Sequence, residues 1–169
     1  MTEPQIQQRE ALPYLAIRSE VTNGVPAVVD RTFPQLFAWL GQHGIEPAGP
    51  PFIRYLEVDH DGEPLEIEAA APVATGAEPD DTVSAGVLPA GRYATLIHIG
   101  PYNHEEVPDL VDAQKALRDW TETQGITTSR PSERGSSLAC CVEHFKVGPP
   151  MEEDWTTWET ELAYLIVES

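Results

Sequence analysis

The chain has 169 residues, of which 10 are lysine or arginine and 28 are aspartate or glutamate, giving a formal net charge of −18 at pH 7. A surface with this charge repels phosphate, which argues against nucleic acid or anionic lipid as a partner and favours encounters with cations. No run of about 18 apolar residues is present, so no membrane-spanning helix is expected. The length fits one domain, or two small units that share a core.

The amino-terminal stretch from Met1 to Glu10 is polar and lacks the basic and then apolar order of a signal peptide, so we expect a cytoplasmic protein. The two cysteines, Cys140 and Cys141, are adjacent in a segment of strand-like composition, where neighbouring side chains point to opposite faces. This geometry disfavours a disulfide or a shared metal ion, and two buried free thiols are expected.

The first predicted elements are a strand and a helix. Residues 14–21 alternate apolar and charged side chains and are followed by Asn23-Gly24, which is typical of a strand that ends in a turn. A helix follows, because apolar residues recur at the helical spacing: Phe33, Leu36, Phe37 and Leu40. Pro34 is unfavourable inside a helix, so we expect a fresh helical start capped by Thr32.

Two strands complete the first half, and a similar order returns in the second half. Strands at 52–58 and 65–71 are joined across Asp61-Gly62, a dipeptide typical of hairpins. A loop rich in proline, glycine and acidic residues follows at 72–81. Further strands are expected at 83–88, 92–99, 138–145 and 158–167. A helix is expected between the strands at 92–99 and 138–145. Its apolar stripe is formed by Val107, Leu110, Val111, Leu117 and Trp120.

The two halves correspond in element order, and Gly44 and Gly125 end equivalent helices. We therefore predict a single α+β domain, spanning 1–169, made of two βαββ (SH2-like) repeats at about 10–72 and 82–168. Antiparallel sheets, two main helices and pseudo-twofold symmetry would leave a central groove between the repeats. Such a groove is a common place for a ligand.

The last predicted strand contains the candidate functional residue, Glu161. Strand alternation places Glu161 in a row with Ala163, Leu165 and Val167, so that a carboxylate opens an otherwise apolar row. A carboxylate there must be paired, reach water or take up a proton. Two interpretations remain open: a half-exposed glutamate at a strand end, or a glutamate at the floor of a pocket for a cationic or polar ligand.

Several short segments resemble the GyrI-like family, which is also known as the effector-binding domain of AraC-type and MerR-type multidrug regulators. These segments are His98-Ile99-Gly100-Pro101-Tyr102, the helix end at Trp120 and Gly125, Phe145, Gly148-Pro149 and Thr160-Glu161-Leu162. The resemblance covers roughly residues 10 to 167. It implies two βαββ units, a groove rimmed by aromatic rings, and a glutamate that meets lipophilic cations; Glu161 is the matching position.

The resemblance and the acidic composition together predict a groove that binds amphipathic, cationic small molecules. A carboxylate attracts a cation that is poorly screened by water, and each aromatic ring adds about 0.5–2 kcal/mol of cation–π attraction. The candidate ligand-binding residues are Glu161, Tyr55, Tyr102, Phe145, Trp158 and Tyr164. For each ring, a place in the core is the alternative.

Other functions fit the same resemblance. Some relatives are hydrolases that open strained cyclopropane rings, and Glu161 with Tyr102 or Tyr164 would direct the water in that case. Phe145 stands where many relatives have tyrosine, which weakens this alternative. One relative inhibits gyrase, so a protein-binding inhibitor is a third possibility. Only about ten residues precede the first predicted strand, which leaves no room for a helix-turn-helix domain, and we expect a stand-alone binding protein.

Sequence motifs for other chemistry are lacking. The histidines follow no metal-ligand spacing, and the chain contains no P-loop, no Gly-x-Gly-x-x-Gly segment and no Gly-x-Ser-x-Gly segment. We therefore expect no metal and no cofactor. The expected partner is a lipophilic or cationic small molecule, with no direct contact to nucleic acid or membrane.

Overall fold

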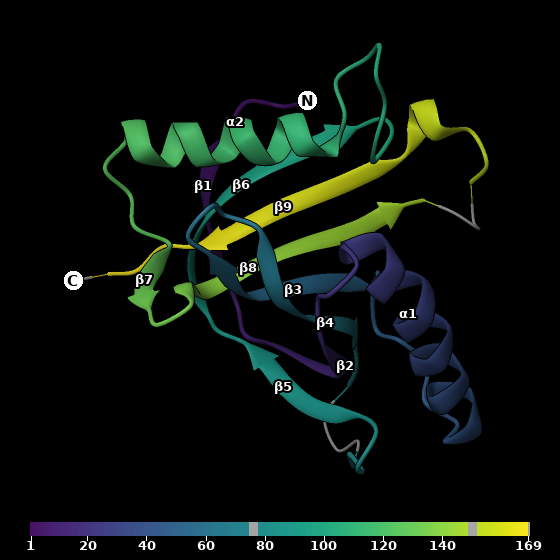
Figure 1. The fold of residues 1–169 in the computed structure, drawn as a ribbon. Helices are drawn as coiled ribbons and strands as arrows, with labels where there is room; N and C mark the ends of the chain where they lie inside the picture. Colours follow the sequence, from purple (N-terminus) through teal and green to yellow (C-terminus); the bar gives the residue numbers. More distant parts are fainter. Residues whose placement is uncertain (75–77, 149–151, 169) are drawn as a thin grey trace.

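The computed structural model describes residues 1–74, 78–148 and 152–168, and these form an α+β fold with two α-helices and a large curled antiparallel sheet (Figure 1). The predicted fold class is thus confirmed. Part of the predicted acidic loop, residues 75–77, lies outside the described residues, as does Pro149 of the Gly148-Pro149 segment.

The described ranges contain nine strands, two α-helices and one short 3₁₀ helix. In chain order they are β1 (Gln5–Arg9), β2 (Leu12–Glu20), α1 (Val25–Gln42), β3 (Phe52–Asp59), β4 (Pro64–Pro72), β5 (Ser84–Leu88), β6 (Gly91–Ile99), α2 (Leu110–Thr123), β7 (Ser129–Ser132), β8 (Gly135–Val147), η1 (Trp155–Thr157) and β9 (Glu159–Leu165). The predicted strands therefore exist, with ends that differ by a few residues.

The strands form one sheet in the order β1-β6-β9-β8-β3-β4-β2-β5, and β7 pairs with β8 outside this path. Outward from the central pair of β8 and β3, the order is β9 and β6 on one side and β4 and β2 on the other. Strands β2, β3 and β4 belong to the first predicted repeat and β6, β8 and β9 to the second, whereas β5, which the prediction placed in the second repeat, pairs with β2 of the first. The division into repeats and the pseudo-twofold symmetry stay predictions.

Both helices pack against the same face of the sheet, which we call the helix face. Leu36 of α1 packs with Leu15 of β2, and Leu117 of α2 packs with Leu162 of β9. The opposite face, which we call the inner face, has a core of its own because the curled sheet brings distant strands together. This inner core includes Tyr14, Phe52, Leu88, Tyr93, Val142 and Ala163.

Helix α1 runs without interruption through Pro34, so the predicted fresh start at Thr32 is wrong. The Thr32 hydroxyl donates a hydrogen bond to the carbonyl of Val28 at 2.7 Å, inside the helix. Proline costs a helix about 3 kcal/mol or more. Burial of the α1 stripe against the sheet, with Leu36 and Leu40 almost fully inaccessible, offsets that cost.

Helix α2 begins at Leu110, after Val107, which the predicted stripe included. Asp109 ends the preceding loop and caps the helix: its side chain accepts from the Asp112 amide at 3.2 Å, and the Asp112 side chain accepts from the Asp109 amide at 2.9 Å. Val111 is 59% exposed, so the buried stripe is shifted towards Ala113 and Leu117. Neither α-helix is long and apolar enough to cross a membrane within the described part of the chain.

Strand β1 was not predicted, because its sequence, Gln5-Ile-Gln-Gln-Arg9, is mostly polar. It pairs with β6 at the edge of the sheet, with Ile6 opposite Ala94 and Arg9 opposite Gly91. None of its five residues is buried, so the strand needs few apolar side chains. The Arg9 side chain of this edge strand contacts the candidate residue Glu161 of β9.

The two cysteines lie on neighbouring positions of β8 and point to opposite faces, as predicted. Cys140 belongs to the inner core, whereas Cys141 belongs to the core under α2. Both are free and buried. Burial raises the pKa of each thiol above its ordinary value, which keeps them protonated and unreactive.

Candidate functional site

Glu161 and the predicted aromatic rings lie on opposite faces of the sheet. Glu161 pairs with His144 of β8 and lies on the inner face, where its carboxylate binds Arg9 (Nη1–Oε1 2.7 Å) and Lys146 (Nζ–Oε2 3.5 Å). Its strand neighbours Thr160 and Leu162 point to the helix face, which follows from the alternation of side chains along a strand. Glu161 therefore does not share a face with the predicted rings, and its place at the floor of a ligand groove stays a prediction.

The rings themselves gather on the helix face. Tyr102, in the loop between β6 and α2, lies between Phe145 of β8 and Trp158, with ring-centroid distances of 5.6 Å and 4.8 Å. Phe145 also meets Phe33 of α1 at 6.3 Å. Tyr55 of β3 packs against both the core under α1 and the core under α2. We call these five residues the aromatic cluster.

Tyr164, the remaining predicted ring, is on the same face but serves the core. It is 8% exposed and packs beneath α2 with Leu117 and Leu162. The alternative interpretation of this ring, a place in the core, is the one that the structure shows. Trp39 likewise packs against the sheet, and its indole donates a hydrogen bond to Asp80 at 2.8 Å.

Sequence reasoning missed the carboxylate that accompanies the aromatic cluster, Glu143 of β8. It is 1% exposed and lies on the helix face, opposite Leu162 of β9 and Ile53 of β3. The Tyr55 hydroxyl donates to its Oε1 at 2.7 Å, and the side-chain amide of Gln114 in α2 donates to its Oε2. None of the ion pairs found in the described ranges includes Glu143.

Burial controls the protonation of this site. It raises the pKa of Glu143 above its ordinary value, while the hydrogen bonds from Gln114 and Tyr55 act in the opposite direction. Burial, followed by the charge of Glu143, raises the pKa of Tyr102 to about 12 and that of Tyr55 well above its ordinary value. The phenols are therefore neutral donors at neutral pH, and the carboxyl is the one acidic group among them.

One signal in the sequence could have identified Glu143. In β8, Cys141, Glu143 and Phe145 alternate on one face, so the acidic residue stands between an apolar and an aromatic neighbour. An acidic residue in an otherwise apolar row is the pattern that singled out Glu161 in the last strand. Applied to both strands, this pattern gives two candidates, Glu143 and Glu161. Only the pairing of the strands shows that the two carboxylates face opposite ways.

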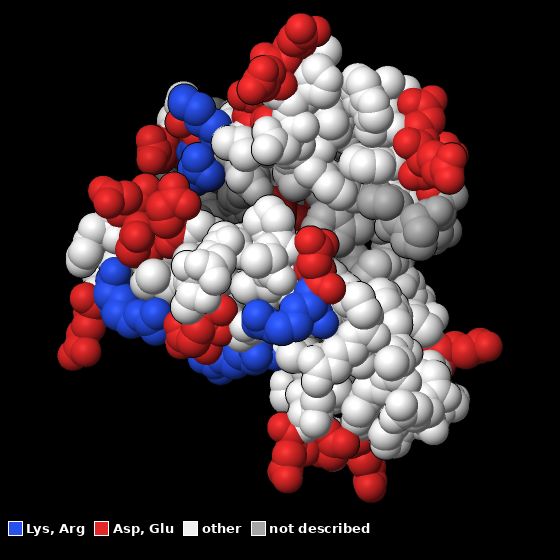
Figure 2. All heavy atoms as spheres, turned by 45° about the vertical axis from the view of Figure 1, so that its right-hand side comes forward, with Lys and Arg blue, Asp and Glu red and all other residues white. Residues whose placement is uncertain are grey.

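The surface on the side of α1 has a hollow, and Figure 2 shows acidic atoms recessed within it, between α1 and the part of the molecule above it. Gly148, which directly follows β8, allows Tyr102 to pack close to the sheet. A Cβ atom at Gly148 would overlap the Tyr102 hydroxyl. A side chain at this position would therefore displace the ring from the cluster.

A family model described as the GyrI-like small-molecule-binding domain matches residues 2–133. The chain belongs to the GyrI-like family. The match to this GyrI-like domain includes Tyr55, Tyr102 and Gln114, whereas Glu143 and Phe145 lie beyond it. No curated protein matches the chain.

Solved structures share the GyrI-like fold of this chain at low identity. The C-terminal domain of EcmrR superposes with a TM-score of 0.79 at 18% identity, covering 99% of this chain and 98% of that domain. In the complex of EcmrR with DNA, the present chain spans 58% of the EcmrR chain. SAV2435 bound to tetraphenylphosphonium has a TM-score of 0.57 at 14% identity, covering 98% of this chain and 94% of that one. A hydrolase from Listeria innocua has a TM-score of 0.60 at 12% identity, covering 98% and 92%.

Proposed function

We propose that this GyrI-like domain binds amphipathic, cationic small molecules on its helix face, between α1 and α2, with Glu143 as the anionic partner. The observation that carries the proposal is a buried carboxyl, 1% exposed, that lacks a cationic partner in the described ranges and lies beside the aromatic cluster. A bound cation would supply the missing charge. The protein would act in the cytoplasm, as expected from the sequence.

The energetics favour a cation over a neutral ligand. An isolated carboxylate away from water is strongly disfavoured unless it is paired or protonated. Glu143 has two hydrogen-bond donors, Tyr55 and Gln114, but these do not neutralise a negative charge. The faces of the surrounding rings add cation–π attraction of about 0.5–2 kcal/mol each. Aromatic rings and a single charge do not require one particular ligand geometry, so ligands of several shapes would bind.

Ligand entry requires the aromatic cluster to open, because Glu143 is almost inaccessible to water. Tyr102 is suited to this movement, since it lies in the segment 100–109, outside the helices and the sheet. A shift of this ring away from Phe145 and Trp158 would expose the carboxyl without breaking a strand or a helix. The ligand would then select the open arrangement through its contacts with Glu143.

One solved structure of similar fold supports the class of ligand. SAV2435 contains tetraphenylphosphonium, a lipophilic cation with four aromatic rings. This compound is also a suitable probe for the present chain, because it combines a delocalised positive charge with aromatic surface.

Calorimetric titration with tetraphenylphosphonium tests the proposal. We expect micromolar affinity for the natural sequence and at least about tenfold weaker binding for Glu143→Gln, which corresponds to a loss of about 1.4 kcal/mol. Glu161→Gln is the matched control, because it removes a carboxylate from the inner face, and it should leave the affinity unchanged. Equal affinities for the natural sequence and Glu143→Gln would overturn the proposal, as would equal binding of the neutral analogue triphenylphosphine oxide.

If the protein is a hydrolase instead, Glu143 rather than Glu161 would direct the water. The raised pKa of Glu143 and its hydrogen bond with Tyr55 at 2.7 Å place an acid–base pair in a dry site, as water-directing catalysis would need. A relative of similar fold is a hydrolase from Listeria innocua. Incubation with a cyclopropane-bearing alkylating compound, followed by mass spectrometry, would detect addition of one water. Product formation that persists in Glu143→Gln would exclude this residue as the catalyst.

A further inference from the structure

A second cavity lies on the inner face, on the other side of the sheet from the aromatic cluster. It has a volume of about 260 Å³ and is lined by four polar residues, namely Arg9, His144, Lys146 and Glu161, and by apolar and small residues, namely Leu12, Ala48, Gly49, Pro50 and Pro72. A smaller cavity of about 60 Å³ shares Arg9, Leu12 and His144 with it and continues towards the inner core. The two cavities are therefore neighbours: the larger one, with its four polar residues, is the polar end of this region, and the smaller one is the more apolar end.

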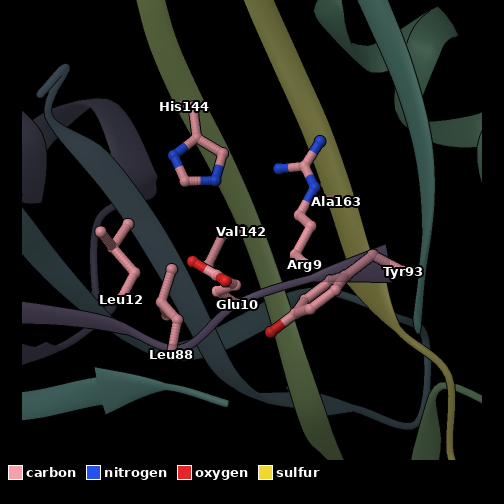
Figure 3. Close-up of a pocket in the computed structure, with 8 residues that line it drawn as sticks. All are labelled: Arg9, Glu10, Leu12, Leu88, Tyr93, Val142, His144 and Ala163. Atoms are coloured by element: carbon pink, nitrogen blue, oxygen red, sulfur yellow. The ribbon is translucent and has the colours of Figure 1, made fainter. Parts of the chain in front are cut away.

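The close-up of the smaller cavity shows this division. In Figure 3, the imidazole of His144 and the guanidinium of Arg9 lie at one end, while Leu12, Leu88 and Tyr93 surround the other. These side chains come from β8, β1, β2, β5 and β6, which the curl of the sheet brings together. The site thus depends on the tertiary structure rather than on one segment.

The charges of the polar end do not cancel. Arg9 and Lys146 share the single carboxylate of Glu161, with N–O distances of 2.7 Å and 3.5 Å. This leaves an excess positive charge on a wall of the cavity, in a chain with a net charge of −18. Glu10 borders the smaller cavity but does not line the larger one, where Arg9, Lys146 and Glu161 meet.

Hydrogen-bond donors also remain free at this end. The Lys146 ammonium has three donor hydrogens, and its contact with Glu161 uses one at most. The imidazole of His144 is 9% exposed and lies beside Phe52 with a ring-centroid distance of 5.2 Å. None of the hydrogen bonds found in the described part of the chain involves a ring nitrogen of His144. Burial lowers the pKa of His144 to about 4, so at neutral pH it presents one N–H donor and one acceptor.

We propose that this inner-face cavity is a second binding site, for a small organic anion with a carboxylate head and a short apolar or aromatic body. The carboxylate would accept hydrogen bonds from Lys146 and His144 and share the charge of Arg9. The body would contact apolar residues of the same larger cavity, Leu12, Pro50 and Pro72. A cation is disfavoured, because both oxygens of Glu161 already have cationic partners.

The site is independent of the helix-face site. The volume of about 260 Å³ is near the lower end of the usual range for ligand pockets, about 300–1,000 Å³, which fits a compound of one ring or a short chain. Glu143 and the aromatic cluster face away from this cavity, since the alternation in β8 that directs His144 inward directs Glu143 to the helices. Each site can therefore be tested without the other.

Three fluorinated probes of similar shape and different charge test this proposal by ¹⁹F NMR titration: 4-fluorobenzoate, 4-fluorobenzyl alcohol and 4-fluorobenzylamine. We expect the benzoate to bind at least about fivefold more tightly than the alcohol or the amine. Lys146→Met should weaken benzoate binding at least about fivefold. Glu161→Gln should strengthen it several-fold, because it frees both cations. Glu143→Gln should leave it unchanged.

The variants should lose a charge at the cavity without losing the fold. The side chain of Lys146 is 39% exposed, so its substitution by methionine should preserve the fold, which thermal unfolding would verify. Arg9→Met tests the second cation in the same way. Equal binding of amine and benzoate would overturn the proposal, and so would benzoate binding that resists Lys146→Met. Benzoate binding that disappears in Glu143→Gln would assign the anion to the helix face and also overturn it.

Discussion

Two buried glutamates in neighbouring strands, Glu143 and Glu161, have opposite electrostatic surroundings. Burial disfavours the charge on both. For Glu161, the hydrogen bond and charge of Arg9 and the charge of Lys146 outweigh burial and hold the pKa below its ordinary value. Among the described residues, Glu143 receives side-chain hydrogen bonds from two neutral donors, Tyr55 and Gln114, and its pKa is raised. Glu161 is thus paired with cations within the protein, whereas Glu143 has no cationic partner among the described residues.

The raised pKa of Glu143 predicts how a variant responds to pH. Because the folded protein binds this proton more tightly than the unfolded chain does, the associated stability is present at low pH and is lost as the pH rises through the folded pKa. Glu143→Gln removes the charge. The melting temperature of this variant minus that of the natural sequence should therefore increase as the pH is raised from 4 to 8. Circular dichroism melts across this range measure the difference. A difference that stays constant with pH would contradict the prediction.

His144 should make the protein less stable in mild acid. Its pKa is lowered to about 4, first by burial and also by the charges of Arg9 and Lys146, while Glu161 acts in the opposite direction. The unfolded chain, with a histidine pKa of about 6.5, binds the proton more readily, so stability falls as the pH drops from about 6.5 towards 4. We expect a loss of about 2 kcal/mol between pH 7 and pH 5. Urea unfolding at both pH values should show a smaller loss in His144→Gln.

At the scale of elements, the cap of α2 connects helix stability with the candidate site. The carboxylate of Asp109 accepts hydrogen bonds from the amides of Asp112 and His104, at 3.2 Å and 3.0 Å. It therefore holds both the first turn of α2 and the loop that contains Tyr102. Helix α1 lacks such a side-chain cap and depends on its buried stripe.

Removal of the cap should destabilise the protein and loosen the aromatic cluster. We expect Asp109→Ala to lower the free energy of unfolding by about 1 kcal/mol, the usual cost of a lost N-cap. The affinity for tetraphenylphosphonium should also change, because the Tyr102 loop loses an anchor. Asp119→Ala, on the exposed side of α2, is the control and should shift stability by less than about 0.5 kcal/mol. Equal urea midpoints for the two variants would refute the capping role.

At the scale of the whole molecule, the two candidate sites use the two faces of one sheet. The helix face combines rings with a carboxyl that forms no ion pair within the described ranges, whereas the inner face has a cavity lined by two cations and one carboxylate. Strand β8 contributes to both, through Glu143 and Phe145 on one side and His144 and Lys146 on the other. The two sites would therefore select ligands of opposite charge.

The net charge of −18 should make stability depend on salt. Like charges repel in the compact state, and salt screens this repulsion over a Debye length of about 10 Å at 0.1 M. We expect the melting temperature to rise by several degrees between about 20 mM and about 300 mM sodium chloride. Potassium chloride should have the same effect if screening is the cause. A melting temperature that falls with salt would show that attractive ion pairs dominate instead.

Much of the fold followed from local patterns. Alternation predicted the described strands other than β1 and β7, helical spacing predicted α1 and α2, and the family resemblance predicted the α+β architecture that the structure shows. These signals are local, since the side chains of a strand or helix report which sides are buried. Pro34 led to the wrong prediction of a fresh helical start, because the low helix propensity of one proline is a local cost that burial of the whole helix can outweigh.

The sequence alone determined the family resemblance, the elements and the set of aromatic residues from which the candidate site is built. Only the tertiary structure decided which carboxylate those residues accompany. Glu143 and Glu161 are both acidic residues in largely apolar strands, and the partner of each, Tyr55 or Arg9, comes from a strand more than 80 residues away. The physical reason is that the pairing of strands depends on contacts between distant segments, which the pattern within one strand does not contain.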